Sequence, residues 1–370
     1  MIYPKLISKI TSISQLSEEE KKRLERVTKI YPFRANDYYL SLIDWKNEND
    51  PIKRLIIPQE DEIDETWGDL DPSGEKDYTV IEGVEHKYES VALFLLSNIC
   101  YGVCRYCFRK RLFNYNKKDY LKERDYNKAI SYVKEHPEIN NVLLTGGDPL
   151  VLHTEKLEYL ISKLFEVPHV KIIRIGTRMP QFYPFRISED NKLLDLIKKY
   201  SRNDRRIYVV NHFIHPKEIT PQSVECIQKL IDAGAILCNQ TPLIKGISDN
   251  IEDLRELFNK LSYIGCPPYY VFQCRPAKGN RKFAVPVEEG YKIFEKAKDK
   301  CAGLAKRARY AMSHRTGKLE ILALTKNEII FKYHRAAKRE NVGKVVVARR
   351  NSEAYWFDDY EIINEYPLYI

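Results

Sequence analysis

The stretch Val91-Ala-Leu-Phe-Leu-Leu-Ser-Asn-Ile-Cys-Tyr-Gly-Val-Cys-Arg-Tyr-Cys107 decides the fold class and the candidate chemistry of this chain. It joins an apolar, strand-like run at residues 91–96 to a C-x3-C-x2-C motif at Cys100, Cys104 and Cys107. Three thiolates this close in sequence can converge on one soft metal centre, whereas a closed zinc or iron–sulfur site takes four ligands. Either a distant residue completes the set, or one metal position stays open for chemistry.

The residues after this motif alternate between strand-like apolar runs and segments with helical spacing. The expected strands lie at residues 91–96, 142–144, 170–175, 207–210, 235–237 and 269–272. The expected helices lie at residues 126–134, 154–165, 191–200, 221–233, 250–264 and 287–304. This alternation predicts parallel strands joined by helical crossovers. Six such units predict an α/β fold, a partial (β/α)6 TIM-like barrel, because the closed barrel needs eight.

Two regions flank this barrel core, which we assign to residues 86–305. Residues 1–85 are expected to form a helical N-terminal extension, and the acidic run at residues 60–65 within it is expected to be a solvated face. Residues 306–370 are expected to form a β-rich C-terminal cap. Its short antiparallel strands are predicted at residues 319–322, 328–333, 344–349 and 355–357.

The composition is that of an ordinary globular protein, with 44% hydrophobic and 31% charged residues among 370. No apolar run reaches the length of a membrane span, and the first twenty residues lack a signal-peptide core, so we expect a cytoplasmic protein. Eight cysteines are too few for a disulfide scaffold, and those outside the motif are expected to be small buried side chains. The net charge of +9 suits an anionic small molecule, and nucleic acid is not the expected partner.

Polar clusters follow all six expected strands, at the edge where the carboxyl ends of parallel strands meet. After the cysteine motif come Thr145-Gly-Gly-Asp-Pro149, Gly176-Thr-Arg-Met-Pro180, Asn211-His-Phe-Ile-His215, Cys238-Asn-Gln-Thr241 and Gln273-Cys-Arg275. In parallel α/β folds, ligands gather at this edge. We therefore expect the six clusters to form one site.

The cysteine motif, with Tyr106 before its third cysteine, resembles the signature of radical S-adenosylmethionine (SAM) enzymes. A larger set of strings resembles the lysine 2,3-aminomutase family, in unbroken order from about residue 30 to residue 300. These strings are Tyr38-Tyr-Leu-Ser-Leu-Ile43, Cys104-Arg-Tyr-Cys-Phe-Arg-Lys-Arg111, Thr145-Gly-Gly-Asp148, Arg174-Ile-Gly-Thr-Arg178, His212-Phe-Ile-His-Pro-Lys-Glu-Ile-Thr220, Asn239-Gln240 and Tyr269-Tyr-Val-Phe-Gln-Cys274. The resemblance implies an isomerase that acts on a small amino-acid-like substrate and receives electrons from a reducing electron-transfer protein.

The same resemblance implies a role for each matched position. A [4Fe-4S] cluster with one iron open to SAM would be held by Cys100, Cys104 and Cys107. Reduction would then cleave SAM to a 5′-deoxyadenosyl radical, which abstracts hydrogen from the substrate. The residues that contact SAM would be Gly146, Gly147, Asp148, His212 and Gln240. Arg109 would bind the substrate carboxylate, for which a guanidinium is well suited.

Departures from the family concern its second cofactor and its substrate. The aminomutases carry pyridoxal 5′-phosphate (PLP) as a Schiff base on a lysine in a glycine-rich string, and Lys318 stands there with one glycine left. Lys87 and Ser90 replace arginines that would bind the PLP phosphate, so Lys318 is either the PLP lysine or an exposed turn residue. Arg275 and Ala311 replace two aspartates that face the distal ammonium of lysine. Arg275 would therefore contact a substrate with an anionic or neutral polar distal end.

Other interpretations stay open. One is a radical SAM enzyme without PLP that catalyses dehydrogenation, epimerisation or carbon–carbon bond chemistry. Another is a zinc-stabilised binding module, in which His212 or His215 completes the three cysteines. Gly146 and Gly147 would by themselves also suit a tight turn between a strand and a helix. No cysteine follows Cys301, so the zinc-bridged oligomer of the family is not assumed, and the oligomeric state is left open.

Overall fold

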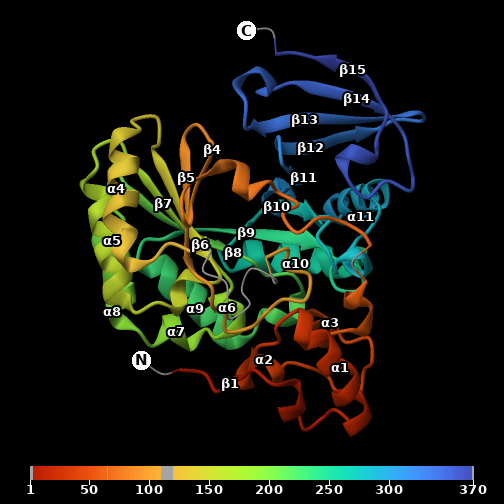
Figure 1. The fold of residues 1–370 in the computed structure, drawn as a ribbon, viewed down its shortest axis with the longest axis horizontal. Coiled ribbons are helices and arrows are strands. Elements are labelled where there is room, and N and C mark those ends of the chain that lie inside the picture. The colour runs from red at the N-terminus through yellow and green to blue at the C-terminus, as the bar shows by residue number, and fades with distance from the viewer. Residues whose placement is uncertain (1–2, 65, 110–119, 369–370) are drawn as a thin grey trace.

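A computed structural model describes residues 3–64, 66–109 and 120–368 of the chain. At its centre is one sheet of thirteen described strands, and six consecutive parallel strands of this sheet form the partial barrel (Figure 1). They are β5 (Val91–Ser97), β6 (Asn141–Gly146), β7 (Ile172–Thr177), β8 (Arg206–Asn211), β9 (Ile236–Leu243) and β10 (Pro268–Gln273). Each neighbouring pair is hydrogen-bonded in parallel. The predicted α/β fold class is confirmed.

Amphipathic helices follow these strands and cover the outer face of the barrel (Figure 1). The long ones are α4 (Tyr126–Glu135), α5 (Thr154–Glu166), α8 (Asn191–Tyr200), α9 (Pro221–Asp232), α10 (Ile251–Tyr263) and α11 (Val287–Asp299). In α5, Leu157, Leu160, Ile161 and Leu164 recur at helical spacing and are completely buried. Two short helices, α6 (Met179–Phe182) and α7 (Phe185–Ser188), complete the connection after β7. The helices therefore form where the sequence predicts them.

The N-terminal region packs below the barrel (red in Figure 1). It contains the helices α1 (Glu18–Ile30), α2 (Asp37–Leu40) and α3 (Pro51–Ile56) and the short antiparallel pair β1 (Leu6–Ile7) and β2 (Ala35–Asn36). The strands β3 (Thr79–Ile81) and β4 (Val84–Tyr88) then join the edge of β5 in antiparallel pairing. This region is thus helical at first and becomes part of the main sheet before the barrel begins.

One expectation for the N-terminal region is wrong at Glu62, in the acidic run that was predicted to be a solvated face. The Glu62 carboxylate accepts a hydrogen bond of 2.8 Å from Nη2 of Arg105, and both side chains are 0% exposed. Arg105 also donates to the carbonyl oxygen of Pro32 at 2.9 Å, and its backbone N–H donates to the carbonyl of Leu55. A carboxylate buried this deeply needs a paired cation. Because Arg105 lies between Cys104 and the third cysteine, the N-terminal region fixes the cysteine loop.

The C-terminal antiparallel region is present, and its strands continue the barrel sheet (blue in Figure 1). After β11 (Arg309–His314), which pairs in parallel with β10, come β12 (Gly317–Leu324), β13 (Glu328–Ala336), β14 (Val345–Arg349) and β15 (Ile362–Tyr366). The strand predicted at residues 355–357 is wrong. The Asp359 carboxylate accepts the backbone N–H groups of Tyr355 and Trp356, which holds these residues in a turn. The last strand is β15.

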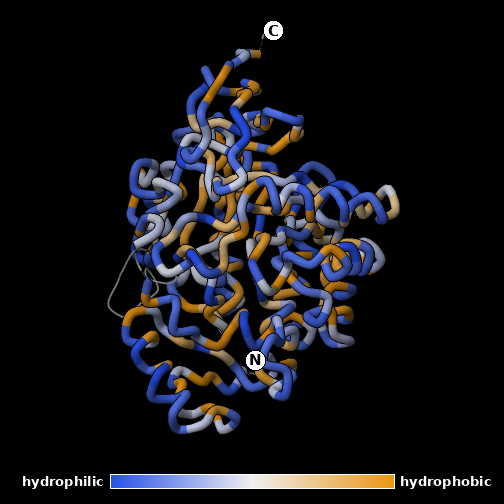
Figure 2. The backbone as a smooth tube through the Cα atoms, turned by 90° about the vertical axis from the view of Figure 1, so that its right-hand side faces the viewer, coloured by the Kyte–Doolittle hydropathy of each residue, from blue (hydrophilic) through white to orange (hydrophobic). Residues whose placement is uncertain are grey.

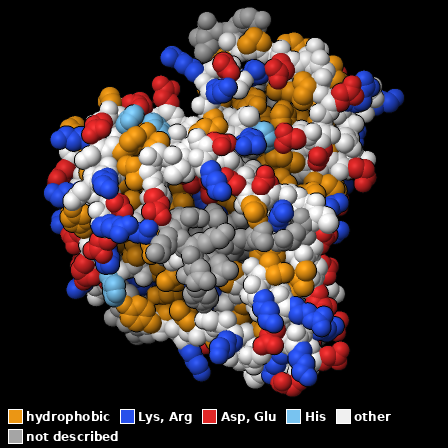
Figure 3. All heavy atoms as spheres, viewed as in Figure 1, with side chains coloured by type: hydrophobic (Ala, Val, Ile, Leu, Met, Phe, Trp, Pro, Cys, Tyr) orange, Lys and Arg blue, Asp and Glu red, His pale blue; other side chains and the backbone are white. Residues whose placement is uncertain are grey.

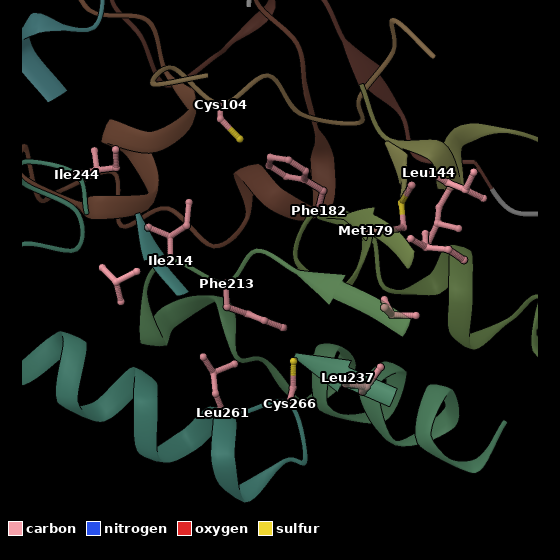
Figure 4. Close-up of a cluster of buried hydrophobic side chains, with 14 of the residues drawn as sticks. Cys104, Leu144, Met179, Phe182, Phe213, Ile214, Leu237, Ile244, Leu261 and Cys266 are labelled. Carbon is pink, nitrogen blue, oxygen red and sulfur yellow. The ribbon is translucent and has the colours of Figure 1, made fainter. Parts of the chain in front are cut away.

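Apolar segments run mainly through the interior, and polar segments run along the outside (Figure 2). Phe182, Phe213 and Ile214 belong to a buried cluster that also contains Cys104, so the cysteine loop rests directly on the core (Figure 4). Lysine and arginine side chains alternate with aspartate and glutamate on the face shown in Figure 3, which is not the basic stripe of a nucleic-acid-binding surface. No helix in the described part of the chain is long and apolar enough to cross a membrane.

Candidate functional site

A cavity of about 350 Å³ lies in the barrel toward the carboxyl ends of the parallel strands. Every residue predicted for the site contributes to its lining: Cys100, Cys104, Cys107, Arg109, Gly146, Gly147, Asp148, His212, Gln240, Arg275 and Lys318. They come from the loops or strand ends that follow β5, β6, β8, β9 and β10, and from β12. The structure therefore brings these residues into one cavity, while their individual roles stay predictions. The basic residues at positions 110 and 111 lie outside the described residues.

The two glycines after β6 hold the cysteine loop in place. The Gly147 N–H donates to the carbonyl oxygen of Ser97 at 2.6 Å, and the next backbone N–H, of Asp148, donates to the carbonyl of Ile99 at 2.8 Å. A Cβ atom on Gly147 would lie 2.3 Å from the Ile99 oxygen, and Gly146 has a φ of +124°, which side chains rarely adopt. Glycine is therefore required here by the close approach of two backbones. The same two residues also face the cavity.

The three motif cysteines line the cavity but are not drawn tightly together. Among the described residues, His86, His136 and Glu138 form the one group of three or more potential ligands whose donor atoms all lie within 4.8 Å of one another. A single tetrahedral zinc with bonds of about 2.3 Å would bring three sulfurs to about 3.8 Å from one another. In this structure the three described thiols therefore do not form a cluster as tight as a single zinc ion requires.

Arg178 is the residue in closest electrostatic contact with the cysteine motif. Its Nη1 donates to Sγ of Cys104 at 3.3 Å and to the hydroxyl of Tyr106 at 2.8 Å, and its Nη2 pairs with the buried carboxylate of Glu218. Burial raises the pKa of the Cys104 thiol, and the Arg178 guanidinium opposes that rise. A bound metal would add the positive charge that keeps such a thiol ionised.

The two histidines proposed as a fourth zinc ligand have different environments. His215 begins a 3-10 turn, where its Nδ1 accepts the backbone N–H of Lys217 at 3.1 Å, and it does not line the cavity. His212 does line the cavity, and burial beside Arg178 and Arg275 lowers its pKa to about 3. Its imidazole is therefore neutral at physiological pH. Of the described histidines, His212 alone lines the cavity.

Asp148 and Gln240, two other residues predicted to contact SAM, differ in whether their side chains already have hydrogen-bond partners within the protein. The Asp148 carboxylate accepts hydrogen bonds from the backbone N–H groups of Leu150 and Arg178 and from the hydroxyl of Thr177, all at 2.8–3.0 Å. Burial nevertheless raises the pKa of Asp148 to about 6. Asp148 therefore ties β6 to β7, whereas the Gln240 side chain has no hydrogen-bond partner among the described residues and faces the cavity.

Arg109 lies between two glutamates that the sequence did not suggest. Its Nε donates to Oε2 of Glu75 at 3.0 Å, and its Nη2 lies 3.6 Å from Oε1 of Glu85. Burial, reinforced by the nearby Glu75, raises the pKa of Glu85 to about 8. Glu85 therefore holds a proton at neutral pH, and its Oε1 has no hydrogen-bond partner. Arg109 is therefore paired with the Glu75 carboxylate, and the neutral Glu85 adds no second negative charge beside it.

Lys318 lies inside the cavity on β12, which excludes the exposed-turn interpretation. Its Nζ lies 4.5 Å from the ring centroid of Tyr270 and 4.9 Å from that of Phe272. Burial lowers the pKa of Lys318 well below its ordinary value, and the neighbouring guanidinium of Arg335 acts in the same direction. Burial therefore favours the neutral amine of Lys318, which is the reactive form of a lysine nucleophile.

Arg275 projects into the cavity from the end of β10. Its guanidinium carbon lies 3.8 Å from the ring centroid of Phe108, and its buried Nη1 has no hydrogen-bond partner. A buried donor without a partner costs about 1–3 kcal/mol, more for a charged group, so it favours a ligand that accepts from it. The side chain that the sequence suggested for the substrate thus lines the cavity and has a buried donor without a partner among the described residues.

Five charged residues of this site have no role predicted from the sequence: Glu75, Glu85, Arg174, Arg178 and Arg335. Arg178 had a usable signal, since it lies within the polar cluster that follows a predicted strand. Arg174 begins one of the strings that carry the family resemblance. It lies within β7, and the strand pattern alone does not mark a residue inside a strand as functional. Arg335 lies in β13, far from every motif in sequence, and only the β12–β13 pairing brings it to Lys318.

The similarity of this chain to known proteins agrees with this geometry. Residues 94–259 match the family model described as "Radical SAM superfamily". A protein of Aquifex aeolicus, named provisionally as an L-lysine 2,3-aminomutase, is 49% identical over 364 residues, which cover 98% of this chain and 96% of that protein. The L-lysine 2,3-aminomutase of Clostridium subterminale is 38% identical over 76% of this chain and 66% of its own length. The glutamate 2,3-aminomutase of Clostridioides difficile is 36% identical over 81% of this chain and 69% of its own length.

Proposed function

This chain belongs to the lysine 2,3-aminomutase family of the radical SAM superfamily, and from that premise we propose that it moves an amino group between C2 and C3 of an amino acid with an anionic distal end. The observation that carries the proposal is Arg275, which lines the cavity and whose buried Nη1 has no hydrogen-bond partner among the described residues. A carboxylate is the best acceptor for a buried guanidinium. The relatives carry both lysine and glutamate in their names, so family membership alone does not choose between these substrates.

The charge of the cavity argues against lysine as the substrate. The distal ammonium of lysine would meet the guanidinium of Arg275, and two like charges in a partly desolvated site repel each other by several kcal/mol. Ala311 is completely buried and offers no side-chain acceptor. An acidic amino acid would instead place its α-carboxylate near Arg109 and its distal carboxylate near Arg275.

The residues of the cavity suit the cofactors of the family. Cys100, Cys104 and Cys107 would hold the iron–sulfur cluster, and Lys318 would hold PLP through its neutral amine. When bound, the reduced cluster and SAM supply the radical that removes hydrogen from the substrate, and PLP supplies an aldehyde for its amino group.

The protein itself contributes charge, orientation and exclusion of water. Arg178 stabilises the Cys104 thiolate through its 3.3 Å contact with the sulfur. Arg109 orients the substrate carboxylate, and because Glu85 beside it is protonated, only Glu75 of these two glutamates balances the charge of the guanidinium. The cavity walls keep solvent away from the reacting atoms, which a radical reaction requires.

The test uses the full chain after anaerobic cluster reconstitution, with SAM, dithionite and PLP. Separate samples receive glutamate, aspartate, glutamine or lysine, and the products are identified by mass spectrometry and NMR. We expect a β-amino isomer from an acidic amino acid, formed faster than from lysine. Comparable isomerisation of lysine would contradict the substrate assignment. Formation of 5′-deoxyadenosine without PLP, and without any isomer, would support a PLP-independent radical SAM reaction instead.

A further inference from the structure

Five lysine and arginine side chains line the cavity and form no ion pair with a carboxylate of the described residues: Lys87, Arg174, Arg275, Lys318 and Arg335. Two of them, Lys87 and Arg174, donate hydrogen bonds to uncharged acceptors. The Nζ of Lys87 donates to the carbonyl oxygens of Ser73 and His314 at 3.2 and 2.8 Å, and Nε of Arg174 donates to Oδ1 of Asn141 at 2.8 Å. Gathering buried cations without counter-charges is costly. The cluster therefore favours a ligand with more than one negative charge, such as a phosphate ester.

Arg335 holds a particular position in this cluster. The antiparallel pairing of β12 and β13 places it directly opposite Lys318, and its guanidinium carbon lies 4.1 Å from the ring centroid of Tyr88. Tyr88 follows Lys87 and precedes Ser90 by two residues, and these are the two positions that lack the family's phosphate-binding arginines. The guanidinium of Arg335 thus reaches the strand edge where those arginines are missing.

Arg174, on β7, lines the same cavity as Arg335. Its side chain is partly buried, and repulsion from Arg335 adds to burial in lowering its pKa. Two arginines that repel each other inside a cavity are stabilised together by one shared anion. Each guanidinium presents several N–H donors in a fixed plane, which matches the oxygens of a phosphate group.

We propose that Arg335 on β13 and Arg174 on β7 bind the phosphate of a PLP molecule attached to Lys318, in place of the arginines that are absent at Lys87 and Ser90. The inference rests on the proposed function, since it assumes PLP as the second cofactor. Attachment needs no oxidant or reductant, because the Lys318 amine adds to the PLP aldehyde and one water leaves. In this arrangement the phosphate is bound by side chains of β13 and β7 and not by side chains at the end of β4, the strand before the barrel.

The test compares PLP with pyridoxal, which has the same aldehyde but no phosphate. Covalent binding is followed by absorbance and by borohydride reduction in the wild type, in Arg335→Met and in Arg335→Lys. Arg335→Met should raise the Kd for PLP by about tenfold or more, as expected for loss of a hydrogen-bonded charge pair, and leave the Kd for pyridoxal unchanged. The Kd for PLP of Arg335→Lys should lie between that of the wild type and that of Arg335→Met. The control is Arg339→Met, an exposed residue that does not line the cavity, which should change neither affinity.

The outcomes separate the inference from the proposed function. If the wild type attaches neither PLP nor pyridoxal, the assignment of PLP to this chain is wrong, and the inference is overturned with it. If the wild type attaches PLP but Arg335→Met weakens both ligands equally or neither, the inference alone is overturned. A second measurement needs no variant: inorganic phosphate should compete with PLP on the wild type but not with pyridoxal. Equal competition against both, or none, would contradict phosphate binding by this cluster.

Discussion

The Nη1 atom of Arg178 lies 3.3 Å from the Sγ atom of Cys104, which joins a buried guanidinium directly to the cysteine motif. The same guanidinium pairs with Glu218, whose side chain is 0% exposed. Arg178 therefore connects the first strand-end cluster, after β5, to the cluster after β8. Loss of this residue should affect both the metal centre and the packing around it.

Arg178→Gln should lower the midpoint potential of the reconstituted cluster. A nearby cation stabilises the more negative, reduced state, so removing it makes reduction harder, by about 60 mV for each tenfold change in equilibrium constant. The measurement is a redox titration followed by electron paramagnetic resonance. Because the substitution leaves Glu218 buried without its partner, Arg178→Lys, which keeps the positive charge, separates the charge effect from misfolding and should keep most of the potential. Arg124→Gln, at an exposed position, serves as the control. A potential that falls equally in Arg178→Gln and Arg178→Lys, or in neither, would remove Arg178 from the electrostatics of the site.

Glu62→Gln should destabilise the protein by about 3–5 kcal/mol, because it leaves Arg105 charged and buried without its carboxylate. Urea unfolding of the reduced, metal-free protein measures the free energy of unfolding. Glu60→Gln, in the same acidic run but exposed, should change it by less than about 1 kcal/mol. Equal effects of the two substitutions would show that the buried pair does not fix the cysteine loop.

Glu85→Gln should abolish a pH dependence of substrate binding. Below about pH 8 the Glu85 carboxyl is neutral, and above it the carboxylate competes with the substrate carboxylate for Arg109. In the wild type the KM should therefore be level below about pH 8 and rise above it, by up to about tenfold per pH unit. In Glu85→Gln the KM should stay level across this range. A rise of equal steepness in both proteins would assign the titration to another group.

Arg275→Asp should change the substrate preference of the cavity. The substitution replaces a buried guanidinium with a carboxylate, which attracts the distal ammonium of lysine and repels a distal carboxylate. The ratio of kcat/KM for lysine to that for glutamate should rise by about tenfold or more, since one charged contact is worth at least 1.4 kcal/mol. The ratio is measured with both substrates in one reaction mixture. A ratio that does not change would mean that Arg275 does not face the distal end of the substrate.

Periodicity and strand-end chemistry predicted the barrel well, because both follow from local patterns. The apolar run at β5 and the helical repeat of α5 each carry their own signal, and their boundaries lie close to the predicted ones. Pairing over long distances carries no such signal. The burial of Glu62 depends on Arg105, which lies 43 residues away, and the sequence alone does not reveal that partner. The turn at residues 355–357 is different, because Asp359 accepts N–H groups only three and four residues away, so its signal was local.

The site shows the same division. The eleven residues to which the sequence assigned a place in the site all line one cavity, because most of the motifs that contain them end parallel strands of a single sheet. The charged side chains that shift the pKa values of these residues come from other elements of the fold. Glu85 reaches Arg109 from the hairpin before the barrel, and Arg335 reaches Lys318 from a strand in the C-terminal sheet. A solvated charge and a buried one look alike in a sequence, so the pKa values of Glu85 and Lys318 required the structure.

The measurement that tests the account most directly is the location of bound PLP. The anaerobically reconstituted wild type is incubated with PLP near neutral pH, reduced with borohydride, digested and mapped by mass spectrometry. We predict a single phosphopyridoxyl modification on Lys318, absent in Lys318→Ala, at a PLP concentration that leaves exposed lysines such as Lys128 unmodified. Modification spread over exposed lysines, with Lys318 unlabelled, would contradict the assignment of this cavity to PLP-dependent amino-group migration.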